Sequence, residues 1–164
     1  MCLHYILPKD KRKQILDKID REGIKVYKVA EVLSGMYFPI FMGITPYRGT
    51  MIADTEDKII VGSHHCHWDL HGQPEVYSSG FHFFKTKAAA QRFCDEVISY
   101  RPFLQFKVIS AIVKKSWVTE IGTEARYGKN ENGVYSSGNQ EIVIVAKKAI
   151  FSEKNNEDNK LQNL

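Results

Sequence analysis

The sequence lacks the long apolar runs and paired cysteines that would assign it to several common classes of protein. No run approaches the roughly 20 apolar residues of a membrane helix, and the stretch from Pro8 to Lys13 is already polar, unlike a signal peptide. Three cysteines, at positions 2, 66 and 94, are too few and too scattered for a disulfide framework. We therefore expect a cytoplasmic protein with no membrane partner.

Dense blocks of one charge are also missing. The net charge is +4, and no cluster of Lys and Arg is dense enough to indicate a nucleic-acid-binding surface. Binding of nucleic acid is compatible with the sequence but is not indicated by it. A modest positive charge suits an anionic small molecule or a host protein as partner. The sequence contains no motif that identifies a cofactor, and it is compatible with an oligomer.

Two helices are predicted from apolar spacing and from end signals. The first lies within Pro8 to Gly23, where Ile15, Leu16 and Ile19 share one side and Gly23 would supply a left-handed cap. The second covers Lys87 to Tyr100, with Thr86 as its N-cap and apolar residues at helical spacing.

Extended segments account for most of the remaining chain. Residues 24–33 are β-branched and aromatic, and "FLQFKVISAIVKKSWV" and "EIVIVAKKAIF" are apolar on both alternating faces, as in central strands. We predict an α+β fold with a mixed or antiparallel twisted sheet of five to seven strands and two helices. Residues 1–151 would form one domain, and 152–164 a disordered polar tail.

The pentapeptide VYSSG occurs twice, at residues 76–80 and 134–138. Both copies precede an extended segment, and Ser-Ser-Gly is typical of a turn or bulge before a strand. Their flanks differ, so the repeat does not indicate a duplicated domain. If both strands start at one end of the sheet, the serines and glycine amides would offer a cluster of donors to an anion.

Four of the six histidines lie in "SHHCHWDLH", residues 63–71. This segment fits either a mobile polar loop or, with a third ligand from elsewhere, a transition-metal site. Neither CxxC nor HExxH is present, so we predict no metal. Removal of Met1 would leave Cys2 with a free α-amine, an arrangement used by N-terminal nucleophiles, although an ordinary thiol fits equally.

The strongest candidate for ligand binding is an arginine in a bend. Arg48 lies between Pro46 and Gly49, and a guanidinium binds phosphate through two parallel hydrogen bonds. The turn at Ser78 and Ser79 would form the opposite wall of an anion pocket. His82 faces away from the phenylalanines beside it in "GFHFF", so it is either an interior residue or part of the pocket lining. The predicted ligand-binding residues are Tyr47, Arg48, Ser78, Ser79, His82 and Glu141.

Three of these positions resemble a motif set of ADP-ribosyltransferases. Arg48 in "PYRGTM", Ser79 in "VYSSGF" and Glu141 in "GNQEIVIV" follow the order of that family's Arg, Ser-Thr-Ser and Glu motifs. The resemblance implies that Arg48 contacts the cofactor phosphates and that Ser79 holds the nicotinamide pocket. It also implies that Glu141 stabilises the ribosyl cation.

A broader resemblance covers most of residues 1–151. The order from the Met-Cys start through "YRGTMIAD" and "SGFHFFKTKAAAQRF" to "IVIVAKKAIF" is similar to small uncharacterised proteins of phages and prophages. It implies an accessory protein that binds an anionic, nucleotide-like ligand or a host protein, in order to counter host defence. The alternative is an enzyme acting on a nucleotide, with Arg48, His82 and Glu141 as its polar groups.

Overall fold

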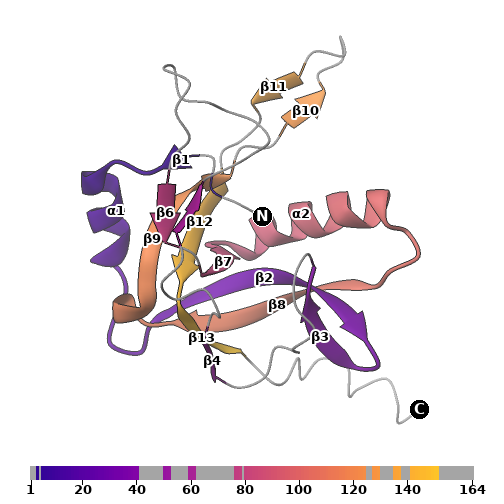
Figure 1. The fold of residues 1–164 in the computed structure, drawn as a ribbon, viewed down its shortest axis with the longest axis horizontal. Coiled ribbons are helices and arrows are strands. Elements are labelled where there is room, and N and C mark those ends of the chain that lie inside the picture. The colour runs from indigo at the N-terminus through magenta and orange to yellow at the C-terminus, as the bar shows by residue number, and fades with distance from the viewer. Residues whose placement is uncertain are drawn as a thin grey trace.

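The computed structural model describes residue 3 and residues 5–40, 50–52, 59–61, 76–78, 80–124, 127–129, 135–137 and 141–151. It confirms an α+β fold with two α-helices and a twisted antiparallel sheet (Figure 1). In the described chain no helix is long and apolar enough to cross a membrane. The predicted tail, 152–164, lies outside the described residues. The elements are β1 (Tyr5–Ile6), α1 (Lys9–Leu16), β2 (Ile24–Leu33), β3 (Met36–Pro39), β4 (Thr50–Ile52), β5 (Ile59–Val61), β6 (Val76–Ser78), β7 (Phe81–Phe84), α2 (Lys87–Tyr100), β8 (Phe106–Val113), the 3₁₀ turn η1 (Lys115–Trp117), β9 (Val118–Glu124), β10 (Tyr127–Lys129), β11 (Tyr135–Ser137), β12 (Glu141–Ala146) and β13 (Lys148–Phe151).

The main sheet has the strand order β1-β9-β12-β7-β2-β8-β13-β4, and β3 pairs with β2 beside this path, which makes nine strands. Seven remain when the short edge strands β1 and β4 are set aside, in agreement with the predicted range. Every pairing among these strands is antiparallel. Consecutive side chains alternate between the two faces of a strand, so each face carries its own apolar core.

Two cores lie on opposite faces of the sheet. The α1-side core includes Val26, Phe83 and Ile144, and Ile15 of α1 packs into it. The α2-side core includes Phe84 and the small helix residues through which α2 approaches the sheet closely, Ala89, Ala90 and Cys94. Burial on both faces explains why β12 is apolar at every position after its first, as expected for a central strand.

The second helix matches its sequence prediction from end to end. The Thr86 hydroxyl accepts a hydrogen bond from the Ala89 amide at 3.2 Å, which satisfies one of the free amides of the first turn. The apolar spacing puts Ala89, Cys94 and Val97 on the buried side. Local signals and packing agree here, so the helix could be predicted accurately.

The first helix is shorter than predicted. It ends at Leu16, because the chain turns at Asp17 and Lys18 and then buries Ile19 outside the helix. Gly23 does have a positive φ, +100°, but it opens β2 instead of capping α1. A Cβ at Gly23 would lie 2.8 Å from the Val113 carbonyl oxygen, so the glycine is required by the close approach of β8.

The segment "EIVIVAKKAIF" forms two strands and not one. The chain breaks at Lys147, whose amide donates to the carbonyl of Trp117 at 3.0 Å. Before the break, β12 pairs with β7 and β9; after it, β13 pairs with β8 and β4. The break transfers the chain from one half of the sheet to the other.

Candidate functional site

Half of the residues predicted to bind a ligand fall outside the described chain. This holds for Tyr47, Arg48 and Ser79, as well as for Cys2 and the histidine segment 63–71. The part of the chain that the structure describes contains no group of three or more His, Cys, Asp or Glu that could hold a metal ion.

Three residues of each VYSSG copy lie in strands, whereas Ser79, Val134 and Gly138 lie outside the described residues, so a turn or bulge before the following strand stays a prediction. Val76 to Ser78 form β6, in which Ser78 pairs with Ile59 of β5. Tyr135 to Ser137 form β11, which pairs with β10. The two copies therefore belong to separate two-stranded sheets.

His82 is an interior residue on the α2 side of the sheet. The residue is only 7% exposed, and its Nδ1 donates to the carbonyl oxygen of Gly80 at 3.1 Å. Burial, and then the charge of Lys28, lowers the pKa of His82 to about 3. The ring is thus neutral near pH 7, with its tautomer set by the Gly80 contact.

Lys28 projects from β2 towards the neighbouring strand β7. Its ammonium donates to the carbonyl of His82 at 3.1 Å and lies 5.8 Å from the centre of the Phe83 ring. Tyr27 and Phe84 are the residue pair that joins β2 to β7. Lys28 therefore supplies a side-chain donor to the His82 carbonyl beside this short pairing. Burial lowers the pKa of Lys28 to about 8, and the charge of Glu124 partly opposes this effect.

Glu141 begins β12 and is held by α2. Its carboxylate accepts from Arg92 Nε at 3.0 Å and from Arg92 Nη2, an ion pair that links the helix to the sheet. The carboxylate side chain is 12% exposed. Glu141 and His82 are therefore both described, and both serve contacts within the fold.

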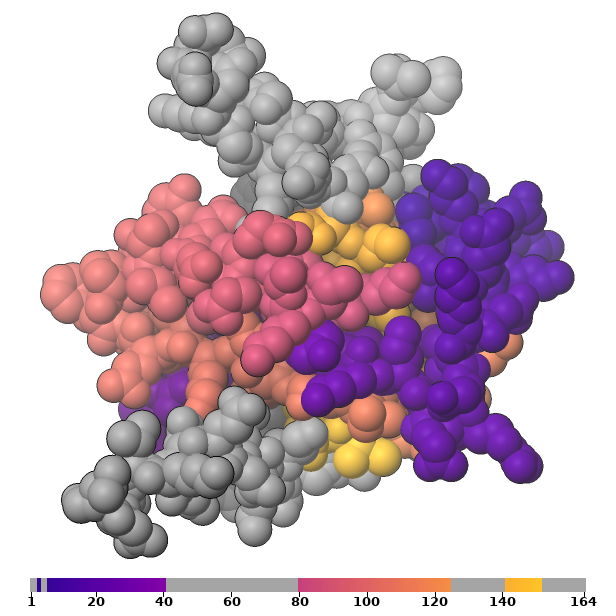
Figure 2. Space-filling view, turned by 180° about the vertical axis from the view of Figure 1, so that it is seen from behind, coloured from indigo at the N-terminus to yellow at the C-terminus, as the bar shows by residue number. Residues whose placement is uncertain are grey.

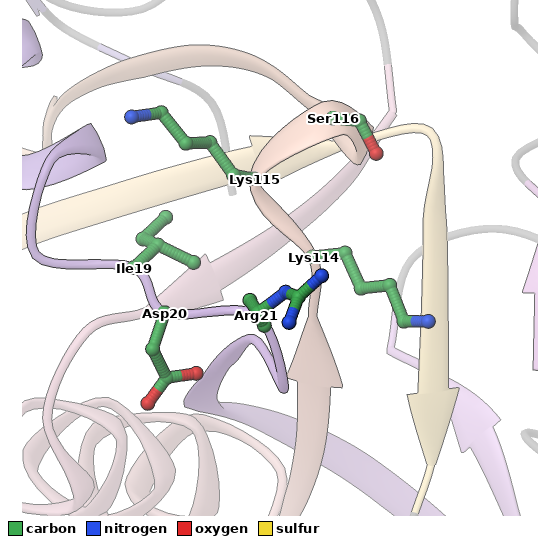
Figure 3. Close-up of a pocket in the computed structure, with 6 residues that line it drawn as sticks. All are labelled: Ile19, Asp20, Arg21, Lys114, Lys115 and Ser116. Carbon is green, nitrogen blue, oxygen red and sulfur yellow. The ribbon is translucent and has the colours of Figure 1, made fainter.

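A shallow, open pocket lies at a corner of the molecule, and its lining residues were not among those predicted to bind a ligand. Two chain segments form it, the turn before β2 and the turn after β8, and we call it the corner pocket (Figure 3). The pairing of Ile24 with Val113 brings these turns together, because the residue before one strand then neighbours the residue after the other. The lining residues are Ile19, Asp20, Arg21, Lys114, Lys115 and Ser116.

The cationic side chains of the corner pocket differ in whether they are paired with a carboxylate. Lys115 pairs with Asp17 at 2.9 Å, and this contact lowers the pKa of the Asp17 carboxyl. The Arg21 guanidinium lies toward the base of Lys114, whose ammonium points to the side opposite Lys115 (Figure 3). Within the described residues neither Arg21 nor Lys114 forms an ion pair with a carboxylate.

Asp20, the acidic residue that lines the corner pocket, is also engaged in hydrogen bonds. The Asp20 carboxylate accepts from the amides of Glu22 and Gly23 at 2.9 and 3.0 Å, which closes the turn that presents Arg21. The Lys114 ammonium lies over the Trp117 ring, 5.4 Å from its centre. This contact orients the lysine side chain but does not neutralise its charge. The pocket thus offers two cationic groups and the Ser116 hydroxyl to an anion.

Positive charge is concentrated around this corner. Residues 9–25 together with 114 and 115 contain nine basic and four acidic side chains, whereas the whole chain has a net charge of +4. The segments are separated by almost ninety positions, so the sequence displayed two modest clusters. Residues 24–33 and 106–113 pair in antiparallel register. A prediction of this pairing would have shown that the two basic clusters lie side by side.

Comparison with known proteins yields no relative on which a function could be based. No family model matches the chain, no curated protein matches it, and no solved structure matches its fold.

Proposed function

We propose that this protein is a binding protein that holds an anionic, phosphate-bearing ligand in the corner pocket. The observation that carries the proposal is that Arg21 and Lys114 line one pocket and that neither forms an ion pair with a carboxylate among the described residues. A guanidinium can grip two phosphate oxygens, an ammonium adds a mobile point charge, and the Ser116 hydroxyl can donate a third hydrogen bond.

The wider proposal is an accessory protein of phage-like origin whose ligand is nucleotide-like and which counters host defence. The +4 net charge and its concentration beside the pocket support an anionic ligand. Binding is favoured over nucleotide chemistry because two groups of the enzyme alternative are engaged elsewhere. Glu141 is paired with Arg92, and His82 is buried and uncharged near neutral pH.

The test begins with native mass spectrometry of the purified protein, to identify any bound molecule, and continues with calorimetric titration of ADP as the probe. We expect Arg21→Ala to weaken ADP binding by about 2 kcal/mol, close to 30-fold, because a charge-assisted hydrogen bond is lost. Arg21→Lys should recover only part of the affinity, since a point charge lacks the planar fork of arginine.

Lys87→Ala is the matched control. Lys87 is an exposed cation at the start of α2 and does not line the pocket, so this variant should bind ADP like the wild type. Absence of ADP binding, or equal loss in Lys87→Ala and Arg21→Ala, would contradict the proposal. All three variants alter exposed side chains, so their melting temperatures should match that of the wild type.

A further inference from the structure

Exposed apolar side chains gather at one end of the molecule. Six large apolar residues of the described chain are exposed, and only Ile150 lies elsewhere. Scattered exposed residues need no explanation, but a group of this size marks an interaction surface. We call it the end patch, and it consists of Leu33, Ile98, Tyr100, Phe103 and Leu104.

The β2–β8 ladder extends into the patch and brings its two chain segments together. The Val32 amide donates to the Gln105 carbonyl at 2.8 Å, one step beyond the last paired residues, so Leu33 and Leu104 lie opposite each other. The Leu104 amide donates to the Arg101 carbonyl at 3.1 Å, which folds the connection back under the last turn of α2. Figure 1 and Figure 2 both place the end of α2 and the connection to β8 at one edge of the molecule.

The area of the patch approaches what one half of a dimer interface requires. Phe103 is 97% exposed and Tyr100 is 78% exposed. Since a fully buried aromatic side chain covers about 150–250 Å², the two rings alone present about 300 Å². The three aliphatic residues bring the patch to the upper part of the roughly 300–600 Å² found on monomers. With a polar rim, it approaches the roughly 800 Å² that each partner contributes to a standard interface.

The distribution of charge favours a second copy of this chain as the occupant. The charged corner around α1 lies at the opposite side of the molecule from the end of α2 (Figure 1). Residues 9–25, 114 and 115 hold five more positive than negative charges, so the remaining chain, with the whole at +4, is close to neutral. Two copies that meet at their end patches therefore keep their positive corners apart.

We propose that the end patch is the interface of a twofold symmetric homodimer. In such a dimer the same surface faces itself, and an apolar surface is complementary to itself. Phe103 would act as the central anchor, because a protruding aromatic ring that becomes fully desolvated dominates binding energy. This inference is independent of the ligand proposed for the corner pocket.

Sedimentation velocity of the full chain at about 1 to 300 µM, a range that brackets interfaces of this size, tests the proposal. We expect the mass to rise from 18.8 kDa towards twice that value as concentration increases. Phe103→Ser should raise the dissociation constant of the dimer by about 100-fold, because the change removes an anchor from both halves. Its melting temperature at low concentration should stay unchanged, since Phe103 contributes no buried surface to the monomer.

Ile150→Ser is the control, because it removes an exposed apolar side chain outside the end patch. It should leave the dimer intact. A wild-type protein that remains monomeric over the whole range would overturn the proposal, even if the patch bound an unrelated protein. A dimer that survives Phe103→Ser, or that is weakened equally by Ile150→Ser, would overturn it as well.

Discussion

At the scale of single residues, the buried histidine of the sheet makes the free energy of unfolding depend on pH. His82 has a pKa of about 3 in the folded protein, first because of burial and then because of Lys28. An unfolded histidine has a pKa of about 6.5, so the unfolded chain takes up the proton first as the pH falls. The contribution of His82 to the free energy of unfolding is therefore complete above pH 6.5 and is lost towards pH 3.

We expect His82→Gln to reduce this acid sensitivity. Each pH unit below the unfolded pKa lowers the free energy of unfolding of the wild type by up to about 1.4 kcal/mol through His82. Glutamine takes up no proton in that range. The free energies of unfolding of the two proteins should thus converge as the pH falls. Urea denaturation at about pH 7.5, 5.5 and 4.5 measures the difference. Parallel pH curves would show that His82 is not buried in a neutral form.

At the scale of helices and strands, prediction succeeded where local and tertiary forces agree. Thr86 and the apolar spacing after it define α2 completely, because the same residues that favour a helix also fit the sheet. The end of α1 and the break at Lys147 were missed because packing decides them: Ile19 leaves the helix to be buried, and two strand neighbours compete for "EIVIVAKKAIF".

The contact between β7 and β12 explains the glycine before the predicted ligand residue His82. A Cβ at Gly80 would lie 2.7 Å from the Ala146 carbonyl oxygen, closer than real contacts allow. We expect Gly80→Ala to lower the free energy of unfolding by about 1–3 kcal/mol, the usual cost of overpacking, as measured by urea denaturation.

Gly35→Asn provides a comparison for that variant. Gly35 also has an unusual backbone, with φ of +73°, but a Cβ there meets no atom within 4 Å, and asparagine tolerates this conformation. The change should cost well under half as much. If Gly80→Ala were as stable as the wild type, the two strands could not be as close as described.

At the scale of the whole molecule, the candidate site could not be predicted because it depends on strand order. Arg21 and Lys114 come together only through the pairing of β2 with β8. The strand order β7-β2-β8-β13 cannot be predicted from the pattern of apolar and polar residues along the sequence. Arg48 stood out in sequence because Pro46 and Gly49 mark its bend locally. An anion pocket formed by Arg48 and the Ser78–Ser79 turn remains a prediction, since Arg48 and Ser79 lie outside the described residues.

The same scale yields a test of whether net charge or its location governs anion binding. Lys114→Glu and Lys87→Glu each lower the net charge of +4 by two units, but only Lys114 lines the corner pocket. At about 0.15 M salt the Debye length is near 8 Å, so a distant charge is largely screened from a bound phosphate. We expect Lys114→Glu to elute from a phosphocellulose column at markedly lower salt than the wild type and Lys87→Glu to elute only slightly earlier. Equal shifts for the two variants would mean that the protein binds phosphate through its overall charge, and the corner pocket would lose its role.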